Sequence, residues 1–586
     1  MPELGILGSG EIITIDPFGN ISWLNSNNQR VNWGVGADDR WHFAENEKSV
    51  RQTLDEDGIM SETRMRVPGG DIVQRVDVIP VGTESAALLE FENNTPVPVA
   101  VAIILENYGQ IEIDGKTASL KSLQVVHASK QIALCCSSDS IQALQTSIEN
   151  GTPQPPRTTQ KLTDKNTALI FPLPHATKLR LLVSREGLTE LPKLEQCPSF
   201  EEITNGWRKH LSVGMQISIP ENRTLNAINA SRRHLLIGSG QPVESEFWVK
   251  ENPEEVVPLS AAALFQWGHL QEGKNLLLQC MELSNPGLFR RKVSRKTLFT
   301  LWAWGSYIRF VSDDRMAEIL LPWVQETLQV LFTTLPSKRK LKRRELSLEI
   351  AALQSAVEIL QAAGEVTLAT DVSKQLDLLR NSINVSSATK SLDRALLGNK
   401  KTLEEFIIAL QDRQTMSDSS TTIASVINGA DPTGSFKNNS RSQDPMSSAL
   451  FLLLSRNAFV MEQNLFDGKN LILLNQGFLS NWIGASIEIE NAPINRGKLG
   501  FAIRWHGAAP ALLWAASTDA EITLRSPRID DDWFTNNLKG ETLLAQQELP
   551  ETAVTLFDPA KRLAKPNASI SVEDSLRDPF RYPALG

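Results

Sequence analysis

Short runs of apolar and β-branched residues dominate the first 215 positions of the chain. Each run is bounded by Gly, Asn, Pro or Asp, a spacing that is typical of strands joined by turns. No segment in this part keeps a 3.6-residue period long enough for a substantial helix. We therefore predict an N-terminal β-sandwich over 1–215, because two antiparallel sheets can each bury one face against the other. The predicted strands are 71–80, 85–91, 97–105, 109–115, 124–129, 131–136, 168–173 and 179–184.

Beyond residue 215 the apolar positions change to helical spacing. In the clearest stripe they follow one another at steps of four, three, four and three, which places them on one helix face: Leu346, Ile350, Leu353, Val357 and Leu360. The same pattern predicts eleven helices, at 222–238, 257–270, 274–284, 295–311, 315–333, 346–363, 366–381, 390–398, 402–412, 418–428 and 445–463.

Period-2 alternation returns near the end of the chain. In the run 498–505 apolar residues alternate with charged or small ones, as in a half-buried strand: Leu499, Phe501, Ile503 and Trp505. Gly507 to Pro510 then breaks the run before the next strand starts at Ala511. With further runs at 471–474, 486–490 and 521–526, this pattern predicts a small C-terminal β-domain over 466–550. The polar, proline-containing tail 551–586 is expected to be extended or disordered.

This order of elements, together with the WHG–PALLW segment at 505–514, resembles the six-hairpin glycosidase superfamily of glucoamylase-like proteins. The chain is most similar to uncharacterised bacterial members that carry such a segment in this position. The resemblance covers most of the chain. It implies a multidomain α and β fold, with an (α/α)6 barrel over 216–465 between the two β-domains. It also implies a carbohydrate ligand bound at the barrel mouth, and a twelfth helix within 383–444.

Composition narrows the class of protein. At 586 residues the chain is too long for one ordinary core, and its net charge of -9 argues against a nucleic-acid binder. Neither a membrane-spanning run nor a secretory leader is recognisable. Four cysteines without paired spacing indicate a cytoplasmic protein without a disulfide framework: Cys135, Cys136, Cys197 and Cys280. The adjacent Cys135 and Cys136, at the end of an apolar run, are expected to be buried structural thiols.

Motifs for metals and cofactors are not recognisable in the chain. The histidines lack metal-ligand spacing, and packing or surface roles are expected for His234, His269 and His506. No phosphate-binding loop or nucleophile elbow is present, so we expect no cofactor.

The candidate catalytic residues lie on the long connections between the predicted helices. Long joins after 238, 284 and 333 alternate with short ones, which in a ring of helical hairpins puts the long loops at one end. The first of them carries Glu244 and Glu246 beside Trp248, a ring suited to the floor of a sugar site. Inverting glycoside hydrolysis needs two carboxylates about 6.5–9.5 Å apart. Either glutamate is therefore a candidate acid, whereas Glu254 and Glu255 suit the first turn of the next helix.

The second carboxylate is expected before the helix at 445. Asp444 is the candidate, although an Asp that precedes Pro445 also fits a helix N-cap with proline at the first helical position. Asp431 is the other carboxylate available in this connection.

Two basic segments, 286–296 and 335–346, leave several functions open. Their Arg and Lys residues suit carboxylate or phosphate groups of a ligand, or they could be solvated or pair with the glutamates of the first loop. The candidate substrate-binding residues are Trp248, Arg290, Arg291, Arg295, Trp302 and Arg343. The leading hypothesis is a glycoside hydrolase-like protein acting on an α-linked oligosaccharide by inversion. The alternatives are an inactive relative that binds an anionic glycan or a protein partner, and a glycoside phosphorylase that uses phosphate.

Overall fold

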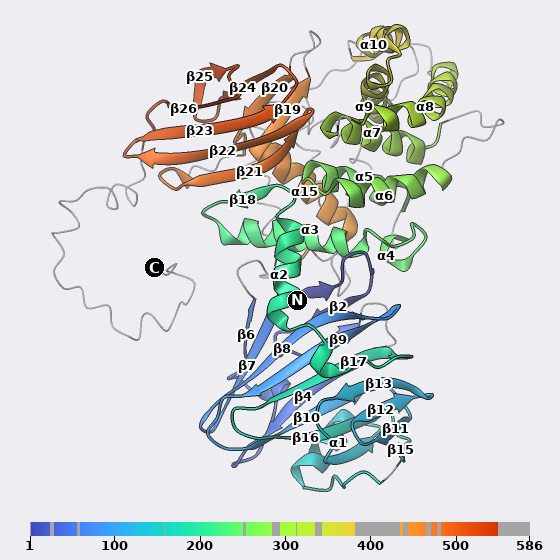
Figure 1. Cartoon of the computed structure of the whole chain (residues 1–586), viewed down its shortest axis with the longest axis vertical. Coiled ribbons are helices and arrows are strands. Elements are labelled where there is room, and N and C mark those ends of the chain that lie inside the picture. The colour runs from blue at the N-terminus through green and yellow to red at the C-terminus, as the bar shows by residue number, and fades with distance from the viewer. Residues whose placement is uncertain are drawn as a thin grey trace, which may run out of the picture.

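The computed structural model places a β-sandwich at one end of an elongated molecule, with helices and two further sheets at the other (Figure 1). It describes residues 2–23, 28–54, 59–157, 159–249, 253–283, 293–311, 313–334, 343–380, 430, 434–436, 444–464, 470–477 and 482–548. All statements below refer to this part of the chain.

Two antiparallel sheets form the N-terminal sandwich, and each of the eight predicted strands overlaps an observed one. Side chains from both sheets share one core, in which the Trp33 and Phe91 rings lie 5.4 Å apart. The first sheet, in the order β1-β2-β3-β4-β10-β16-β14 with β5 beside β4, consists of β1 Glu3–Gly5, β2 Ile12–Ile15, β3 Ile21–Trp23, β4 Arg30–Gly36, β5 Trp41–Phe43, β10 Val99–Glu106, β14 Leu134–Ser138 and β16 Asn166–Leu173.

The second sheet has nine strands. Its order is β15-β11-β12-β13-β17-β9-β8-β7-β6. Its strands are β6 Arg51–Leu54, β7 Ser61–Val67, β8 Gly70–Val81, β9 Glu84–Asn93, β11 Ile111–Asp114, β12 Thr117–Leu120, β13 Leu123–Ala128, β15 Gln160–Leu162 and β17 Lys178–Leu188. Two short 3₁₀ turns, η1 Ala44–Asn46 and η2 Leu194–Gln196, complete the domain.

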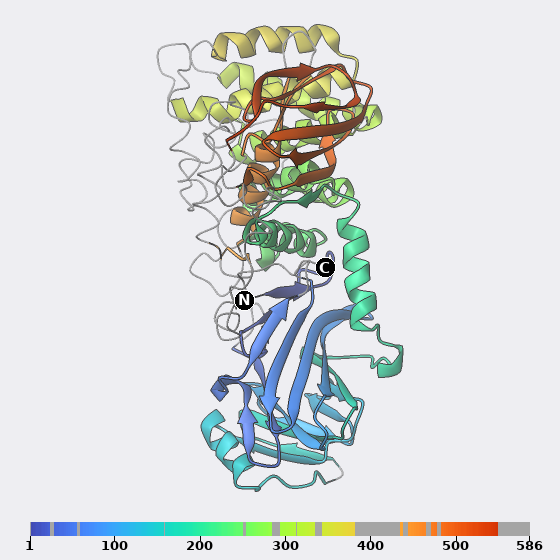
Figure 2. The same ribbon diagram turned by 90° about the vertical axis from the view of Figure 1, so that its left-hand side faces the viewer.

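Two helices lie in the part predicted to hold none, so that prediction was wrong. They are α1 Ile141–Glu149 and α2 Phe200–Leu211. The second starts with a reciprocal capping box, in which Ser199 and Glu202 satisfy each other's backbone amides. It connects the sandwich to the helical region (Figures 1 and 2), so the predicted boundary at 215 falls just after it.

The helical region agrees with the sequence pattern where it is described. Its helices are α3 Asn222–Gly238, α4 Glu246–Val249, α5 Pro253–Gln266, α6 Leu270–Leu283, α7 Arg295–Phe310, α8 Asp314–Thr334, α9 Arg343–Ala362, α10 Val366–Arg380 and α15 Pro445–Phe459. The helix predicted to end at 463 stops at Phe459, where strand β19 begins. The helices predicted at 390–398, 402–412 and 418–428, and the tail 551–586, lie outside the described residues.

The helices divide into an inner and an outer row. Helices α7 and α15 are buried on nearly every side, whereas α6, α8 and α10 bury one face only. Within the inner row α15 packs against α5, α5 against α7, and α7 against α9. A helix that is apolar all round belongs in the interior of a large protein. None of the described helices is long and apolar enough to cross a membrane.

The C-terminal strands belong to two sheets, the first of which also includes β18 from the segment before α3. The first, in the order β18-β21-β22-β23-β26, consists of β18 Gln216–Ser218, β21 Ile487–Ile494, β22 Gly497–His506, β23 Ala509–Thr518 and β26 Lys539–Leu543. The second, in the order β19-β20-β24-β25, consists of β19 Val460–Asn464, β20 Asn470–Leu474, β24 Ile522–Ser526 and β25 Asp530–Thr535. The predicted break at Gly507 is the turn between β22 and β23, with φ at +64°.

Candidate functional site

Both predicted functional segments contact helix α3, at opposite ends. The loop that follows it returns over its last turns, because the Phe247 ring stacks on His234 at 4.9 Å. The segment before α15 contacts its first turns, where Arg223 Nη2 donates to the carbonyl of Ala430 at 3.1 Å. Both connections expected to carry catalytic carboxylates therefore touch one helix, although neither contact was visible in the sequence.

The N-terminal hairpin closes the end of the same helix. The amides of Gly8 and Gly10 donate to the carbonyls of Leu236 and Ile237 at 3.0 and 2.9 Å. The last carbonyls of a helix have no partner within it, so these bonds satisfy groups that would otherwise be orphaned. The approach requires glycine at 240, where a Cβ atom would lie 2.5 Å from the Gly8 carbonyl oxygen.

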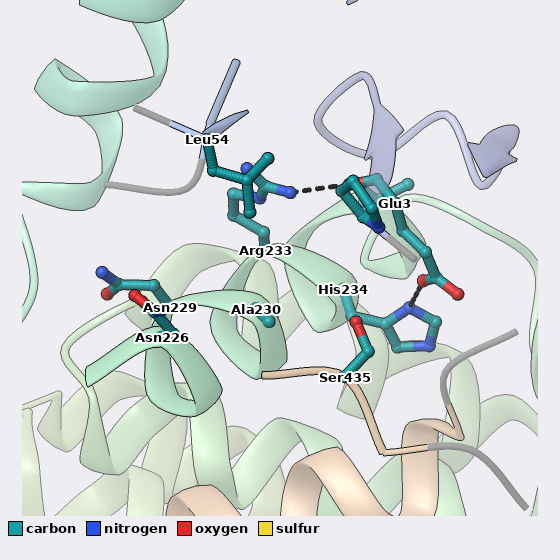
Figure 3. A pocket seen from close by; sticks show the side chains of 10 residues that line it. Glu3, Leu54, Asn226, Asn229, Ala230, Arg233, His234 and Ser435 are labelled. Carbon is teal, nitrogen blue, oxygen red and sulfur yellow. Dashed lines mark hydrogen bonds and ion pairs between the residues drawn. The ribbon is translucent and has the colours of Figure 1, made fainter. Parts of the chain in front are cut away.

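Three buried ionisable side chains line a small cavity between this hairpin and α3 (Figure 3). Arg233 donates from Nη2 to the Glu3 carbonyl at 2.6 Å. The Glu3 carboxylate lies 2.8 Å from Nδ1 of His234, so an ionised Glu3 accepts a hydrogen bond from the Nδ1–H group. Glu3, Arg233 and His234 are only 5%, 6% and 2% exposed. The cluster therefore fixes the first strand of the sandwich to the first long helix.

The cavity itself is small. Asn226, Asn229 and Ser435 complete its wall beside Leu54 (Figure 3). The volume open to the centre of a water molecule is about 20 Å³, which is room for one water and not for a sugar ring. Nε2 of His234 is buried without a hydrogen-bond partner. A ring nitrogen left in this state costs free energy, which marks the cluster as part of a constrained junction.

The candidate carboxylates occupy different environments. Glu244 is exposed on the turn before α4, and its charge reaches the buried Cys280 thiol, helping to raise the pKa of that thiol after the larger effect of burial. Glu246 is the first residue of α4. Asp444 is the N-cap of α15, where its Oδ2 accepts from the amide and the hydroxyl of Ser447 at 2.8 and 2.7 Å. The capping interpretation of Asp444 is thus confirmed.

Both candidate tryptophans are packing residues in the structure, which corrects their expected place on the sugar-binding surface. Trp248 is 1% exposed and packs edge-on against Phe247 at 4.6 Å. Trp302 is 4% exposed inside α7, and its carbonyl accepts the Ser355 hydroxyl at 3.2 Å. A sugar platform needs one open ring face, and burial removes it from both. Trp248 lies in the short helix α4, and its ring belongs to the hydrophobic core of the helical region.

The candidate cations are only partly described. Arg295 makes an ion pair with Glu255, with Nε and Nη2 both 2.8 Å from Oε1, and lies over the Phe299 ring. This is the predicted structural alternative, in which a cation of the second loop neutralises a glutamate of the first. Arg343 is the first residue of α9, while Arg290 and Arg291 lie outside the described residues.

The cysteines are thiols rather than disulfides. Burial raises the pKa of Cys136 to about 11 and that of Cys280 to about 12. Such thiols stay protonated at neutral pH, so the expected structural role fits them.

One group of possible metal ligands lies elsewhere, although the sequence spacing predicted none. Ligand atoms of His210, His269 and Glu272 lie within 4.8 Å of one another. However, Nη2 of the buried Arg232 donates to Nε2 of His269 at 3.2 Å. That guanidinium occupies the lone pair a cation would need and repels any ion beside it. The residues therefore do not fit a resident metal.

Sequence reasoning missed the Glu3, Arg233 and His234 cluster. A signal was present in the run Arg232, Arg233, His234, because three consecutive residues span about 200° of a helix, so a helix buried on most sides turns at least one of them inward. Their partner could not be found this way, since Glu3 lies 231 positions from His234.

Comparisons with known proteins give structural similarities only. No family model matches the chain, and no curated protein matches it in sequence. Similar solved structures include a bacterial glucoamylase complexed with acarbose, at TM-score 0.40 and 9% identity over 67% of this chain and 66% of that one. They also include a family GH92 alpha-mannosidase from Bacteroides thetaiotaomicron, at TM-score 0.34 and 8% identity over 81% and 87% of the two chains. An alpha-L-rhamnosidase from Dictyoglumus thermophilum aligns at TM-score 0.38 and 10% identity over 78% and 61%. The chain thus spans just under two thirds of the glucoamylase.

Proposed function

We propose that the chain is a glycosidase-like protein that binds an oligosaccharide over α3, between the turn at 239–249 and residues 430 and 434–436. The observation that carries the proposal is the convergence of these two connections on one helix. Groups that act on one substrate must lie within reach of the same bond. The two contacts, at Arg223 and His234, lie about 16 Å apart along the axis of α3, so an oligosaccharide rather than a single sugar would have to span them.

The arrangement of the helices supports a closed barrel. An (α/α)6 ring needs its last inner helix beside its first, and α15 packs against both α5 and α3. We propose that this region is the (α/α)6 barrel expected from the sequence. Functional groups would then gather at the end where the long connections lie.

Within this proposal Glu244 is the general acid for inverting cleavage of an α-linked saccharide. Its exposed carboxylate can reach a ligand in the solvent-facing space beside α4. A carboxylate on the opposite side must activate water. In a phosphorolytic variant of the reaction, phosphate takes the place of that water. The cytoplasmic setting predicted from the cysteines belongs to the same proposal.

A second candidate function is binding without catalysis. The specific observation in its favour is that Asp444, the predicted partner carboxylate, is already engaged by Ser447 as a helix cap. The burial of Trp248 and the pairing of Arg295 with Glu255 also remove expected ligand contacts. An inactive relative would keep the carbohydrate surface and lose the acid–base pair.

The test is an assay of the full-length protein on a panel of α-linked glucosides, with and without phosphate, alongside calorimetric binding of the same sugars. Turnover without phosphate supports the hydrolase, and turnover only with phosphate supports the phosphorylase. Binding without turnover supports the inactive relative. If the protein is a hydrolase, Glu244→Gln lowers kcat by at least about a hundredfold, while Glu149→Gln on the exposed face of α1 leaves it unchanged. A protein that neither binds nor turns over any sugar of the panel contradicts the proposal.

A further inference from the structure

An open groove lies where the start of α2 meets the outer face of the second sheet. Its volume is about 430 Å³, within the size range of small-ligand sites. Strands β8, β9 and β17 form one wall and α2 forms the other. The half-buried Met60 supplies apolar surface between the two walls, beside the buried Phe200. Nothing in the α3 site uses these residues.

The sheet side of the groove carries a row of alternating charges. Glu62, Arg75, Glu90 and Arg180 are direct neighbours across strands β7, β8, β9 and β17. Arg75 contacts Glu62 at 2.9 Å and Glu90 at 3.3 Å, and its Nη1 lies 2.7 Å from Glu92. Each side chain is thereby held by its neighbours, so little conformational entropy remains to be lost when a ligand binds.

The helix side is equally fixed. Ser199 and Glu202 close the first turn of α2, with the Ser199 amide donating to Glu202 at 2.8 Å. Arg180 Nη1 donates to the carbonyl of Leu194 at 3.0 Å, and Nη2 donates to that of Pro198 at 2.6 Å. The chain that leads into the helix is therefore anchored to the sheet, and the groove keeps its width.

The charges that line the groove balance. Three cations face three carboxylates: Arg75, Lys178 and Arg208 against Glu90, Glu92 and Glu201. A ligand with net charge of either sign meets as much repulsion as attraction there. A neutral ligand rich in hydroxyl groups can donate to the carboxylates and accept from the Arg and Lys side chains. Its apolar face can lie on Met60.

We propose that this groove binds a neutral saccharide, as a carbohydrate site of the N-terminal domain separate from α3. The inference rests on the lining of the groove and does not depend on catalysis at Glu244. A saccharide held here would contact both the sandwich and the helix that leads to the helical region.

The test is calorimetric binding of maltoheptaose, cellohexaose and a heparin-derived oligosaccharide to the full chain, with hydrogen exchange over 199–208 to locate the site. We expect a neutral sugar to bind and to protect this segment. Arg208→Ala, an exposed groove residue, should weaken binding about tenfold or more because a charged hydrogen-bond donor is lost. The matched control Lys209→Ala, the next exposed cation of the same helix outside the lining, should leave binding unchanged.

A second pair of variants tests the sheet wall. Glu92→Gln should weaken binding, while Glu112→Gln, an exposed and ion-paired glutamate elsewhere on the same sheet, should not. Glu244→Gln should leave the protection of 199–208 intact, so that loss of the α3 site and loss of the groove are distinguishable. The proposal is overturned if neither neutral sugar protects 199–208. It is also overturned if Arg208→Ala binds as Lys209→Ala does, or if the heparin fragment alone protects this segment.

Discussion

The sandwich meets the helices at two places of opposite character. At the β1–α3 junction Glu3, Arg233 and His234 are each less than a tenth exposed, and the space between them has room for only one water. At the β8–α2 groove the side chain of Glu92 is 26% exposed and that of Lys178 51%, beside about 430 Å³ of open volume. Both places carry acids and bases in contact with one another, and burial is what distinguishes them.

This difference shows that burial decides whether an ion pair stabilises the fold or stays available to a ligand. A buried pair cannot be broken without leaving an uncompensated group in a medium of low dielectric constant, so it fixes the two domains relative to each other. A half-exposed pair contributes little stability, and its groups stay available to a ligand. The closed junction therefore holds the two domains together, and the charged groups of the open groove remain accessible to a ligand. The predictions below separate the two.

The largest effect is expected at the closed junction. Glu3→Ala leaves Nδ1 of His234 buried without its partner, beside an Nε2 that already lacks one. We expect it to lower the free energy of unfolding by about 3 kcal/mol, measured by urea denaturation. Glu186→Ala, which breaks an ion pair whose glutamate is 78% exposed, should change it by less than about 0.5 kcal/mol. Equal effects of the two substitutions would refute the distinction by burial.

Two glycine-to-alanine substitutions should change the free energy of unfolding by intermediate amounts and in opposite directions. A Cβ atom at Gly240 would lie 2.5 Å from the Gly8 carbonyl oxygen, so Gly240→Ala must push the N-terminal hairpin off α3. We expect a loss of about 2 kcal/mol. Gly206 lies within α2 with nothing within 4 Å of its Cβ position, so Gly206→Ala should gain about 0.5–1 kcal/mol from helix propensity. Thermal unfolding of both variants checks the prediction, and a stabilised Gly240→Ala protein would contradict the close approach.

A smaller effect on stability is expected at the N-cap of α15. Asp444→Ala removes the N-cap of α15 and should cost about 1 kcal/mol, while Asp444→Ser keeps a capping oxygen and should restore most of it. If Asp444 is only a cap, any turnover survives in the serine variant, since its hydroxyl replaces the bond to the Ser447 amide. Turnover lost in both variants, with stability restored in one, would instead assign Asp444 a catalytic role.

The smallest effect concerns the groove and depends on pH. The hydrogen bond from Arg75 is the main reason that the pKa of Glu92 lies below its ordinary value. A carboxyl with a depressed pKa in the folded state stabilises above its unfolded pKa of about 4.3 and loses this contribution as the pH falls. Glu92→Gln should therefore cost about 0.5 kcal/mol at pH 7, and the difference should shrink below about pH 4. A constant difference from pH 7 to pH 3 would contradict this origin.

Local patterns in the sequence predicted most of the fold. The run 71–80 became β8 and the stripe from Leu346 to Leu360 became α9, because alternation and helical spacing each record one buried face. Helix α2 was missed although its signals were present, with Ser199 and Glu202 in capping spacing and Phe200, Thr204 and Leu211 on one face. Its short length between strands concealed it.

The site could be predicted only in part, because its geometry depends on contacts between distant segments. Asp444 before Pro445 identified a cap from two adjacent residues. Trp248 is buried within the short helix α4, and the residue types of the loop do not predict which way its ring faces. The pairing of Glu3 with His234 joins the first strand of the sandwich to the first long helix of the helical region. Patterns within a window of residues cannot contain such pairs.

The most direct test of the central claim is a crystal structure of the full chain with the tightest-binding saccharide of the panel. The account predicts sugar density over α3, bounded by the turn at 239–249 and residues 430 and 434–436, with the Glu244 carboxylate within hydrogen-bond distance of the ligand. A structure with saccharide bound elsewhere and none over α3 would contradict it.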